Sequence, residues 1–474
     1  MKKTLAFIFI VAAILRLGLV WLAPGWYDEN FTLLVTRLPF AQMMQAVIGD
    51  VHPPLWYLIL WPLGQMHAPV WVLRIPAALC SLASVWVFWR ILQALDLSPN
   101  VRLAALALMA VMPVQIYYAM EARMYALLEL LVLLAFLALL QRRGWLFALA
   151  GVLMLYTQYY GAFYLAALFV AALVIHKGDY KILFGPSILF ISSFLPWALI
   201  VMLPQMGTLS GAYWMQLTGP GMALRVLFQA LFFPPQNAVV QIPLMLGGFG
   251  WLFGSLVYAF RRDGSETRPY SPLIMAFLPF LLAIAFSLVW QPVLHYRPLI
   301  AITPFLYILL AAPAEKLHTT SLRPHFLAEI FLLPILYIPF ASMYLNLRYN
   351  KLPYTTLETT YIAAHWQAGD IVYAMSDDAW VNAAPVAAVY RSPDCAPSLG
   401  ALSPKTRTAL GMQILPLAQI PHTRAWLLWS DSPLDPPCSL PPAGNPLLSK
   451  SDEFTFDGLW LYTNNSSTLL EERR

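Results

Sequence analysis

The sequence has 474 residues, of which 60% are hydrophobic and 11% charged, with a formal net charge of +5. A soluble globular protein carries about 25% charged residues, so lipid must solvate much of this chain. The basic residues stand between apolar runs rather than along one face, which argues against nucleic acid as a partner.

Up to about residue 345, apolar runs recur that are long enough to cross the roughly 30 Å of hydrocarbon in a bilayer. We therefore expect a mainly α, polytopic membrane helix bundle of about eleven spans over residues 1–345. The first run holds Arg16 and lacks a clean small-residue cleavage site, which favours a retained anchor over a cleaved signal peptide. The expected spans are 4–23, 70–93, 101–118, 123–140, 145–158, 160–176, 184–204, 240–260, 271–290, 297–314 and 325–345.

The distribution of loop charges predicts the orientation. Lysine and arginine gather in one set of alternate connections, which begins with Lys2 and Lys3 at the N-terminus. The other connections are longer but hold only Arg37, Arg74, Arg123, Arg225 and Arg297. Positive residues are retained in the cytoplasm. The N-terminus is therefore expected inside and, after an odd number of spans, the C-terminal part outside.

Residues 346–474 are predicted to form a small extracytoplasmic α/β domain. A helix is expected at 356–367, where apolar residues recur at helical spacing. Short strands are expected at 371–375, 385–390, 424–429 and 458–463, separated by turns rich in proline and glycine. This domain either covers the outer mouth of the membrane part or only supports its folding.

The cysteines agree with this topology. Cys80 falls within the second expected span and is interpreted as an inert core residue. Cys395 and Cys438 both fall in the C-terminal domain, which is expected to face an oxidising compartment. We predict a disulfide between them; the alternative is two buried thiols.

Acidic residues are scarce in the membrane half, yet Asp28, Glu29 and Asp50 all fall in the connection after the first span. His52 and a pair of prolines follow Asp50, and Tyr57 comes next in an apolar run of about a dozen residues. That run is too short to span and predicts an interfacial or re-entrant helix that begins at the prolines. An exposed acidic loop is usually only solvated, but this concentration of acids favours a functional site.

A second polar cluster falls at the corner between the third and fourth spans. Pro113 is expected to end or kink the third span. Glu121 then lies at the N-terminal end of the fourth span, where the helix dipole favours an anion. On a continuous helix Arg123 points about 200° away from Glu121, whereas Tyr125 shares its face. Alternatively, Glu121 only caps the helix and Arg123 snorkels to lipid headgroups.

Further cations on the outer side are candidates for holding a phosphate. His295 and Arg297 lie at the outer start of the tenth span, and Arg74 lies at the outer end of the second. Each alone is more often a headgroup anchor, but together with the acids they suit a charged group on a lipid tail. Arg16 and Glu129 lie inside spans and are expected to face protein, where they have a structural role.

Four short motifs follow one another in the first third of the chain. They are YDE at 27–29, DVHPPLWY at 50–57, LRIPAAL at 73–79 and YAMEARMYAL at 118–127. With this order and topology, roughly residues 1–310 resemble the GT-C membrane glycosyltransferases. The resemblance is in particular to the lipid A aminoarabinose transferases, the protein O-mannosyltransferases and bacterial enzymes that act on lipopolysaccharide cores.

The resemblance implies a site on the non-cytoplasmic face of the bacterial inner membrane, with a polyprenyl-phosphate sugar as donor. Asp28 matches the first-loop catalytic acid, and Glu121 matches the second-loop acid. The neighbouring Glu29 leaves two carboxylates for the first role. The acceptor is a lipid, a glycan or a protein, because the C-terminal domain carries no recognisable acceptor-binding signature.

A sugar on a lipid phosphate carries its own leaving group, so the site must supply a base for the acceptor and cations for the departing phosphate. Direct displacement inverts the anomeric centre. Asp28 is suited to act as the base, and Arg297 or Arg123 is suited to bind the departing phosphate. His52 and Glu121 are candidate orienters or ligands of Mg²⁺ or Mn²⁺, although nothing in the spacing requires a metal.

Two other functions fit a polytopic membrane protein. A transporter or flippase of lipid-linked sugars needs polar residues along a path through the membrane, whereas here they crowd at one face. An oligosaccharide ligase or polymerase that uses a lipid pyrophosphate is the other alternative; the WWD signature of the oligosaccharyltransferases is absent.

Overall fold

The computed structural model describes residues 2–21, 25–177, 181–209, 221–232, 238–261, 270–318, 361–362, 364–368, 370–374, 377–385, 389–391, 402–414, 425–431, 448–451 and 456–462. The expected span 325–345, most of the expected helix 356–367, and both Cys395 and Cys438 lie outside these residues. The chain divides into two compact units. Unit 1 comprises Met1–Leu22, Arg74–Ile200 and Met215–Leu347; unit 2 comprises Ala23–Leu73, Val201–Trp214 and Arg348–Arg474.

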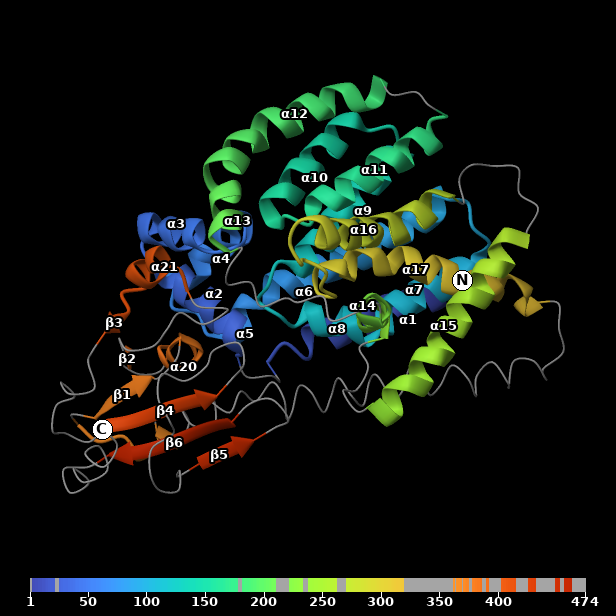
Figure 1. Ribbon diagram of the computed structural model, residues 1–474. Helices are drawn as coiled ribbons and strands as arrows, with labels where there is room; N and C mark the ends of the chain where they lie inside the picture. The colour runs from blue at the N-terminus through green and yellow to red at the C-terminus, as the bar shows by residue number, and fades with distance from the viewer. Residues whose placement is uncertain are drawn as a thin grey trace. The chain divides into compact units, whose positions relative to one another are not determined.

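Unit 1 is a bundle of helices (Figure 1). Each expected span from 4–23 to 297–314 is mainly helical where the structure describes it. The elements are α1 (Lys2–Leu17), α6 (Ile75–Ala94), α7 (Pro99–Val111), α8 (Pro113–Ala119), α9 (Tyr125–Leu140), α10 (Gly144–Thr157), α11 (Gly161–Ile175), α12 (Lys181–Trp197), the π-helical η1 (Ala198–Met202), α14 (Gly221–Phe232), α15 (Ala238–Arg261), α16 (Tyr270–Val289), the 3-10 helix η2 (Pro298–Ile302), α17 (Thr303–Ala311) and the 3-10 helix η3 (Ala312–His318).

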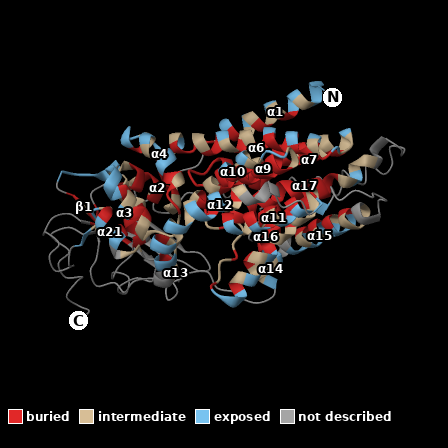
Figure 2. Ribbon diagram, turned by 90° about the horizontal axis from the view of Figure 1, so that it is seen from above, coloured by how far each residue is buried: buried red, intermediate tan, exposed pale blue. Residues whose placement is uncertain are grey.

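Helix α9 lies inside this bundle because its sequence, YALLELLVLLAFLALL, is apolar on every side. It packs against α6, α10 and η2, and Figure 2 shows it and α17 almost wholly buried. Helix α7 ends at Val111, and after Met112 the residue Pro113 begins α8 at an angle of 49°. The expected kink at Pro113 is confirmed; a proline ring prevents the helix from continuing straight.

Four helical stretches in the described part of the chain are long and apolar enough to cross a membrane: Val70–Ala94, Gly185–Met206, Tyr270–Val289 and Pro298–Glu315. The bent pair α7 and α8 makes a fifth if it is counted as one span. Helices α9, α10 and α11 are equally apolar but shorter. The chain is a polytopic membrane helix bundle, as its composition predicts.

Arg16 and Glu129, which were expected to face protein inside their spans, do so in the structure. Arg16 is fully buried and donates hydrogen bonds to Ser81 Oγ (2.8 Å), Ala110 O (2.9 Å) and Met109 O (2.8 Å), which ties α1 to α6 and α7. Glu129 is also fully buried and accepts from Gln115 Nε2 at 2.6 Å. Buried polar groups need such partners, so both residues are structural.

Unit 2 contains the connection after the first span together with the C-terminal part of the chain. Its helices are α2 (Tyr27–Arg37), α3 (Phe40–Gly49), α4 (Leu55–Gln65), α5 (Val70–Leu73), α13 (Leu203–Leu209), α20 (Asp377–Ala383) and α21 (Pro404–Ala409). Helix α4 confirms the short helix predicted after the paired prolines, whereas α2, α3, α20 and α21 were not predicted.

The C-terminal part forms a six-stranded mixed sheet with the order β3-β2-β1-β4-β6-β5. Strands β1, β2, β3 and β4 are parallel neighbours, and β4, β6 and β5 are antiparallel ones. The strands are β1 (Ile371–Ala374), β2 (Val389–Arg391), β3 (Gln413–Ile414), β4 (Ala425–Asp431), β5 (Leu448–Ser451) and β6 (Phe456–Tyr462). The α/β class is confirmed; the polar β5 and the two-residue β3 lack the apolar alternation that predicts a strand.

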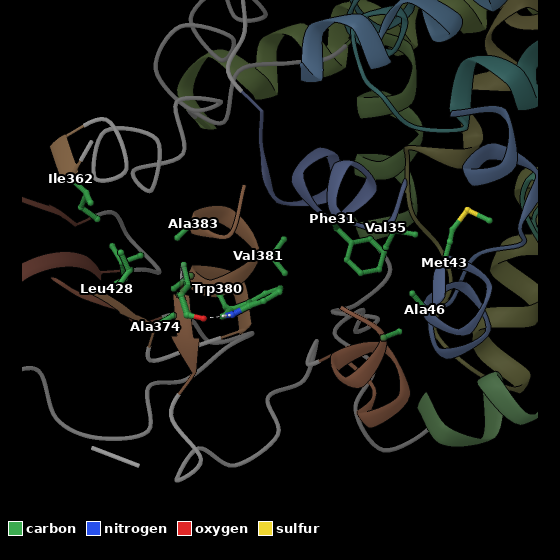
Figure 3. Packing of buried hydrophobic residues seen from close by; sticks show 14 of the residues in the cluster. Phe31, Val35, Met43, Ala46, Ile362, Ala374, Trp380, Val381, Ala383 and Leu428 are labelled. Atoms are coloured by element: carbon green, nitrogen blue, oxygen red, sulfur yellow. Dashed lines mark hydrogen bonds between the residues drawn. The ribbon is translucent and has the colours of Figure 1, made fainter. Parts of the chain in front are cut away.

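The sheet and the first connection share one hydrophobic core (Figure 3). Phe31 and Val35 from α2 and Met43 and Ala46 from α3 belong to the same cluster as residues of β1, α20 and β4. Trp380 of α20 lies in this core, and its indole N–H donates to Val389 O at 3.0 Å. The segments are far apart in sequence but fold as a single body.

Candidate functional site

The first turn of α2 carries Asp28 and Glu29. The helix begins after Trp26, whose extended backbone makes no side-chain cap, so acidic residues in the first turn complement the exposed amide groups and the helix dipole. Glu29 is fully buried, whereas Asp28 is partly exposed. Of the two carboxylates that the sequence left open, Asp28 is the one that solvent reaches.

Helix α4 holds α2 in place. Gly64 of α4 lies so close to α2 that a Cβ at this position would be 2.3 Å from Thr36 O. Gln65 Nε2 donates to Thr36 O and Leu38 O, both at 2.9 Å, and Trp61 Nε1 donates to Leu38 O at 3.0 Å. These bonds satisfy carbonyl groups that the end of a helix leaves without partners. They fix the direction of the helix that carries Asp28.

Three residues predicted near the site meet at the corner between α3 and α4. Asp50 is the C-cap of α3, and its Oδ2 accepts from His52 Nδ1 and from Tyr57 Oη, each at 3.0 Å. A carboxylate oxygen only accepts, so His52 is the donor of this pair through Nδ1. Tyr57 is fully buried and packs edge-on against Phe31 of α2, with ring centroids 6.4 Å apart.

In unit 1, Glu121 and Arg123 lie in the link between α8 and α9 rather than on a helix. Helix α8 ends at Ala119, and α9 begins only at Tyr125. The expected separation of about 200° between the two side chains assumed a continuous helix and does not apply here. Both residues are almost fully buried, so Arg123 does not snorkel to lipid headgroups.

Tyr118 lies near several polar residues of this corner. Its ring packs against Tyr125 with centroids 5.3 Å apart and against Tyr117 at 5.2 Å. The hydroxyl lies within electrostatic range of Glu121 and of Arg297, as well as Tyr296. The structure therefore brings Glu121 of the second cluster and Arg297 of the tenth span to the same tyrosine.

The segment 290–297, which leads to Arg297, is held in a defined path. Tyr160, the N-cap of α11, donates to Val293 O and accepts from His295 N. Ser287 Oγ accepts from the amides of Val293 and Leu294, both at 3.0 Å. Arg297 N donates to His295 Nδ1 at 3.2 Å. Burial and the charge of Arg297 lower the pKa of His295 well below its usual value. His295 is therefore a neutral imidazole rather than a cation.

Arg74 is the residue immediately before α6, and its side chain is fully buried. Its Nη1 donates to Val20 O at 2.9 Å, which anchors the chain beyond the end of α1. Among the residues that the structure describes, no group of three or more His, Cys, Asp or Glu side chains is placed to hold a metal ion. Asp50 and His52 make only a pair.

No protein-family model and no curated protein sequence matches the chain. Solved structures match its fold. ArnT from Cupriavidus metallidurans in the apo state aligns with a TM-score of 0.52 and 13% identity, covering 90% of this chain and 93% of that one. The same protein bound to undecaprenyl phosphate gives 0.51 and 13% identity over 91% and 93% of the two chains. This chain has the fold of the GT-C membrane glycosyltransferases.

An archaeal protein with the GT-C fold matches over less of its length. The Archaeoglobus fulgidus oligosaccharyltransferase in complex with Zn and sulfate aligns with a TM-score of 0.51 and 13% identity, over 89% of this chain and 67% of that one. The chain spans only 64% of the apo form of the same protein. The expected GT-C architecture is confirmed at the level of fold.

Several residues of the corners escaped the sequence analysis. Tyr118 entered only as the first residue of the motif at 118–127, and Tyr160 directly precedes the apolar helix α11; no local pattern gives either residue a role of its own. Asn382, Thr406 and Gln205 contact the first connection from positions far away along the chain. Only the tertiary fold brings these segments together, so no spacing rule finds them.

Proposed function

We propose that this chain is a membrane glycosyltransferase that moves a sugar from a polyprenyl-phosphate donor to a lipid, glycan or protein acceptor, with inversion at the anomeric carbon. The shared fold supports this proposal, because a protein of that fold binds undecaprenyl phosphate. The observation that carries it is the partly exposed Asp28 beside the fully buried Glu29 at the start of α2.

Asp28 is the general base in this proposal. It accepts the proton of the acceptor hydroxyl or amine while that atom attacks the anomeric carbon, and the bond from carbon to the lipid phosphate breaks with its electron pair on the phosphate oxygen. A positioned base typically contributes about 10²- to 10⁴-fold to a rate. Glu29 is buried and serves to support the first turn of α2.

Arg297 is the proposed clamp for the departing phosphate. A guanidinium binds phosphate oxygens through two parallel N–H donors, and the backbone around Arg297 is fixed by Tyr160 and Ser287. Arg123 is assigned to the same phosphate, and Glu121 orients the cations. Arg74 supports the backbone at Val20, and neutral His295 orients Arg297.

The proposed location is the bacterial inner membrane, with the C-terminal domain outside the cytoplasm. The loop charges support this orientation. Alkaline phosphatase fused after residue 350 should be active and a cytoplasmic reporter at the same point silent. The reverse pattern would place the site on the cytoplasmic face of the membrane, whereas the proposed lipid-linked donor is used on the opposite face.

The proposed activity is tested by transfer from a synthetic polyprenyl-phosphate sugar in detergent. Asp28→Asn should abolish transfer while the purified protein still binds the donor, because the substitution keeps the size and removes the base. Glu29→Gln is the matched control and should retain most of the activity. If Asp28, Glu29 and Glu121 are all dispensable, the enzyme proposal fails and a transporter or flippase of lipid-linked sugars becomes the better explanation.

A further inference from the structure

The C-terminal domain contacts the helix that carries Asp28. Asn30, two residues after Asp28 on α2, donates from Nδ2 to Asn382 Oδ1 on α20 at 3.0 Å. The space beside Asn30 is tight, because a Cβ at Gly25 would lie 2.6 Å from its Oδ1. Helix α20 therefore lies directly against the first turns of α2.

The C-terminal domain also contacts the helix that ends at Asp50. The last carbonyl groups of a helix have no partner within the helix, and those of α3 are satisfied by side chains from elsewhere. Thr406 Oγ1 of α21 donates to Ala46 O at 3.3 Å. Gln205 Nε2 of α13 donates to Val47 O at 3.2 Å and to Ile48 O at 3.0 Å. These bonds fix the end of α3, and Asp50 is the next residue after it.

Gly49 permits this close approach. A Cβ added at Gly49 would lie 2.5 Å from Thr406 Oγ1, 2.6 Å from Ser403 Oγ and 3.1 Å from Thr406 N. Ser403 is the N-cap of α21 and accepts from Thr406 N at 3.1 Å, so its hydroxyl is held in place. Any larger residue at 49 must displace either α21 or the turn that holds Asp50.

An ion pair joins the two contacting helices. Asp377, at the start of α20, is buried and accepts from Arg407 Nη2 of α21 at 2.7 Å and from Leu402 N at 3.0 Å. Helix α20 holds α2 through Asn382, and α21 holds α3 through Thr406. The ion pair therefore fixes the distance between the contact of Asn382 with α2 and the contact of Thr406 with α3.

We propose that α20 and α21 form a clamp that positions the candidate site, with Gly49, Thr406, Gln205 and Asn382 as positioning residues. The clamp holds Asp28 through α2, and it holds the group of Asp50, His52 and Tyr57 through α3. In this proposal the C-terminal domain positions the groups of the candidate site, beyond covering the membrane part or supporting its folding. The inference rests on the proposed glycosyl transfer for its kinetic test but not for its structural test.

The central variant is Gly49→Ala, because its effect depends on the clamp. A displacement of about 1 Å can cost on the order of 10²-fold in rate, so we expect a loss of that size in kcat per folded molecule. The triple variant Gly49→Ala, Ser403→Gly, Thr406→Ala removes both hydroxyls that meet the new methyl group. The triple variant also loses the bond from Thr406 Oγ1 to Ala46 O, so recovery should be partial, to about a tenth of the wild-type kcat. General destabilisation does not explain such a rescue.

Gly254→Ala on α15 is the matched control, since a Cβ there meets no atom within 4 Å. It should leave kcat and donor KM unchanged. Hydrogen–deuterium exchange over residues 46–57 provides a second measurement that needs no activity. Exchange in this segment should be several-fold faster in Gly49→Ala than in wild type and should return toward the wild-type rate in the triple variant.

The two proposals fail in different ways. If wild type transfers sugar and Gly49→Ala is equally fast, the clamp has no part in catalysis. If wild type transfers no sugar from polyprenyl-phosphate donors, the proposed function fails, and the exchange measurement still decides whether α21 holds the end of α3. Equal exchange in wild type and Gly49→Ala overturns the clamp itself.

Discussion

Asn30 and Asn382 are 352 positions apart in the sequence, yet their side chains form a hydrogen bond of 3.0 Å. This bond joins the helix that carries Asp28 to the C-terminal α/β part. The two segments share a buried core that includes Phe31, Val35 and Trp380. The connection after the first span is therefore a component of unit 2 rather than a loop of the membrane bundle.

Asn382→Ala tests the contribution of this bond. Loss of a partly buried hydrogen bond between neutral groups costs about 0.5–1.5 kcal/mol, so the unfolding free energy of unit 2 should fall by about that amount. Sugar transfer should fall several-fold, because α2 is less firmly held. Chemical denaturation followed by tryptophan fluorescence and transfer kinetics measure the two effects. Asn382→Asp is a milder change, because its carboxylate still accepts from Asn30 Nδ2.

The group of Asp50, His52 and Tyr57 predicts an order of effects. Asp50→Ala removes the acceptor of both bonds, and we expect it to reduce kcat by about 10- to 100-fold, as for a bond to a charged group. Tyr57→Phe keeps the edge-on packing against Phe31 and loses only one donor, so its effect should be several times smaller. Steady-state kinetics of both variants check the order. A larger loss in Tyr57→Phe would mean that the phenol, rather than the carboxylate, matters.

The polytopic class, the helices of the described spans and the kink at Pro113 could be predicted from the sequence, because apolar length and proline act locally. The conformation around Glu121 could not. The sequence from Glu121 to Tyr125 reads as helix, but the chain leaves helical geometry from Met120 to Met124. Helical propensity is weak, and packing of Tyr118 against Tyr125 and the burial of Glu121 override it here.

Helix α2 shows a second limit of the sequence. Asp28 and Glu29 were expected in a connection, and the helix around them is stabilised from outside by Gln65 and Trp61 of α4. The mixed sheet was only partly foreseen for a similar reason. Strands such as β3 and β5 are short or polar and gain their structure from neighbouring strands.

The prediction for the C-terminal cysteines rests on the sequence alone. Cys395 and Cys438 are expected to form a disulfide, because they are the only cysteines outside the expected spans and the proposed orientation exposes them to an oxidising compartment. Alkylation of denatured protein should add one label per chain, on Cys80, without reductant and three labels after reduction. Three labels without reductant, in protein prepared from the membrane under thiol-blocking conditions, would disprove the bond.

The lowered pKa of His295 predicts how acidity acts on unit 1. The group is neutral in the folded protein well below pH 6.5, whereas in the unfolded chain it takes up a proton near pH 6.5. Above that pH both states are neutral and His295 contributes nothing. As the pH falls below about 6.5, only the unfolded state gains the proton, so stability is lost until the folded-state pKa is reached.

His295→Gln removes this acid sensitivity while keeping a group that accepts from Arg297 N. Its thermal midpoint should therefore fall less than that of wild type between pH 6.5 and pH 5. At pH 7 to 8 the pH dependence of transfer should be the same in both proteins. A wild-type profile with a His295-dependent step in that range would show that the imidazole is charged in the folded state.

The last prediction concerns the phosphate clamp. Arg297 lies within electrostatic range of Tyr118, as does Glu121, and its backbone is fixed through His295. Arg297→Ala should raise donor KM and lower kcat, because a guanidinium binds the phosphate in the ground state and more strongly as negative charge develops. The combined loss in kcat/KM should be about 10- to 100-fold, as expected for a bond between charged groups. Arg297→Lys should recover only part of it, since an ammonium cannot form the paired bonds.

Arg225→Ala is the control, because Arg225 is an exposed arginine on α14 of the same unit. Equal loss in both variants would indicate a general effect of charge on lipid binding and would remove Arg297 from the proposed site.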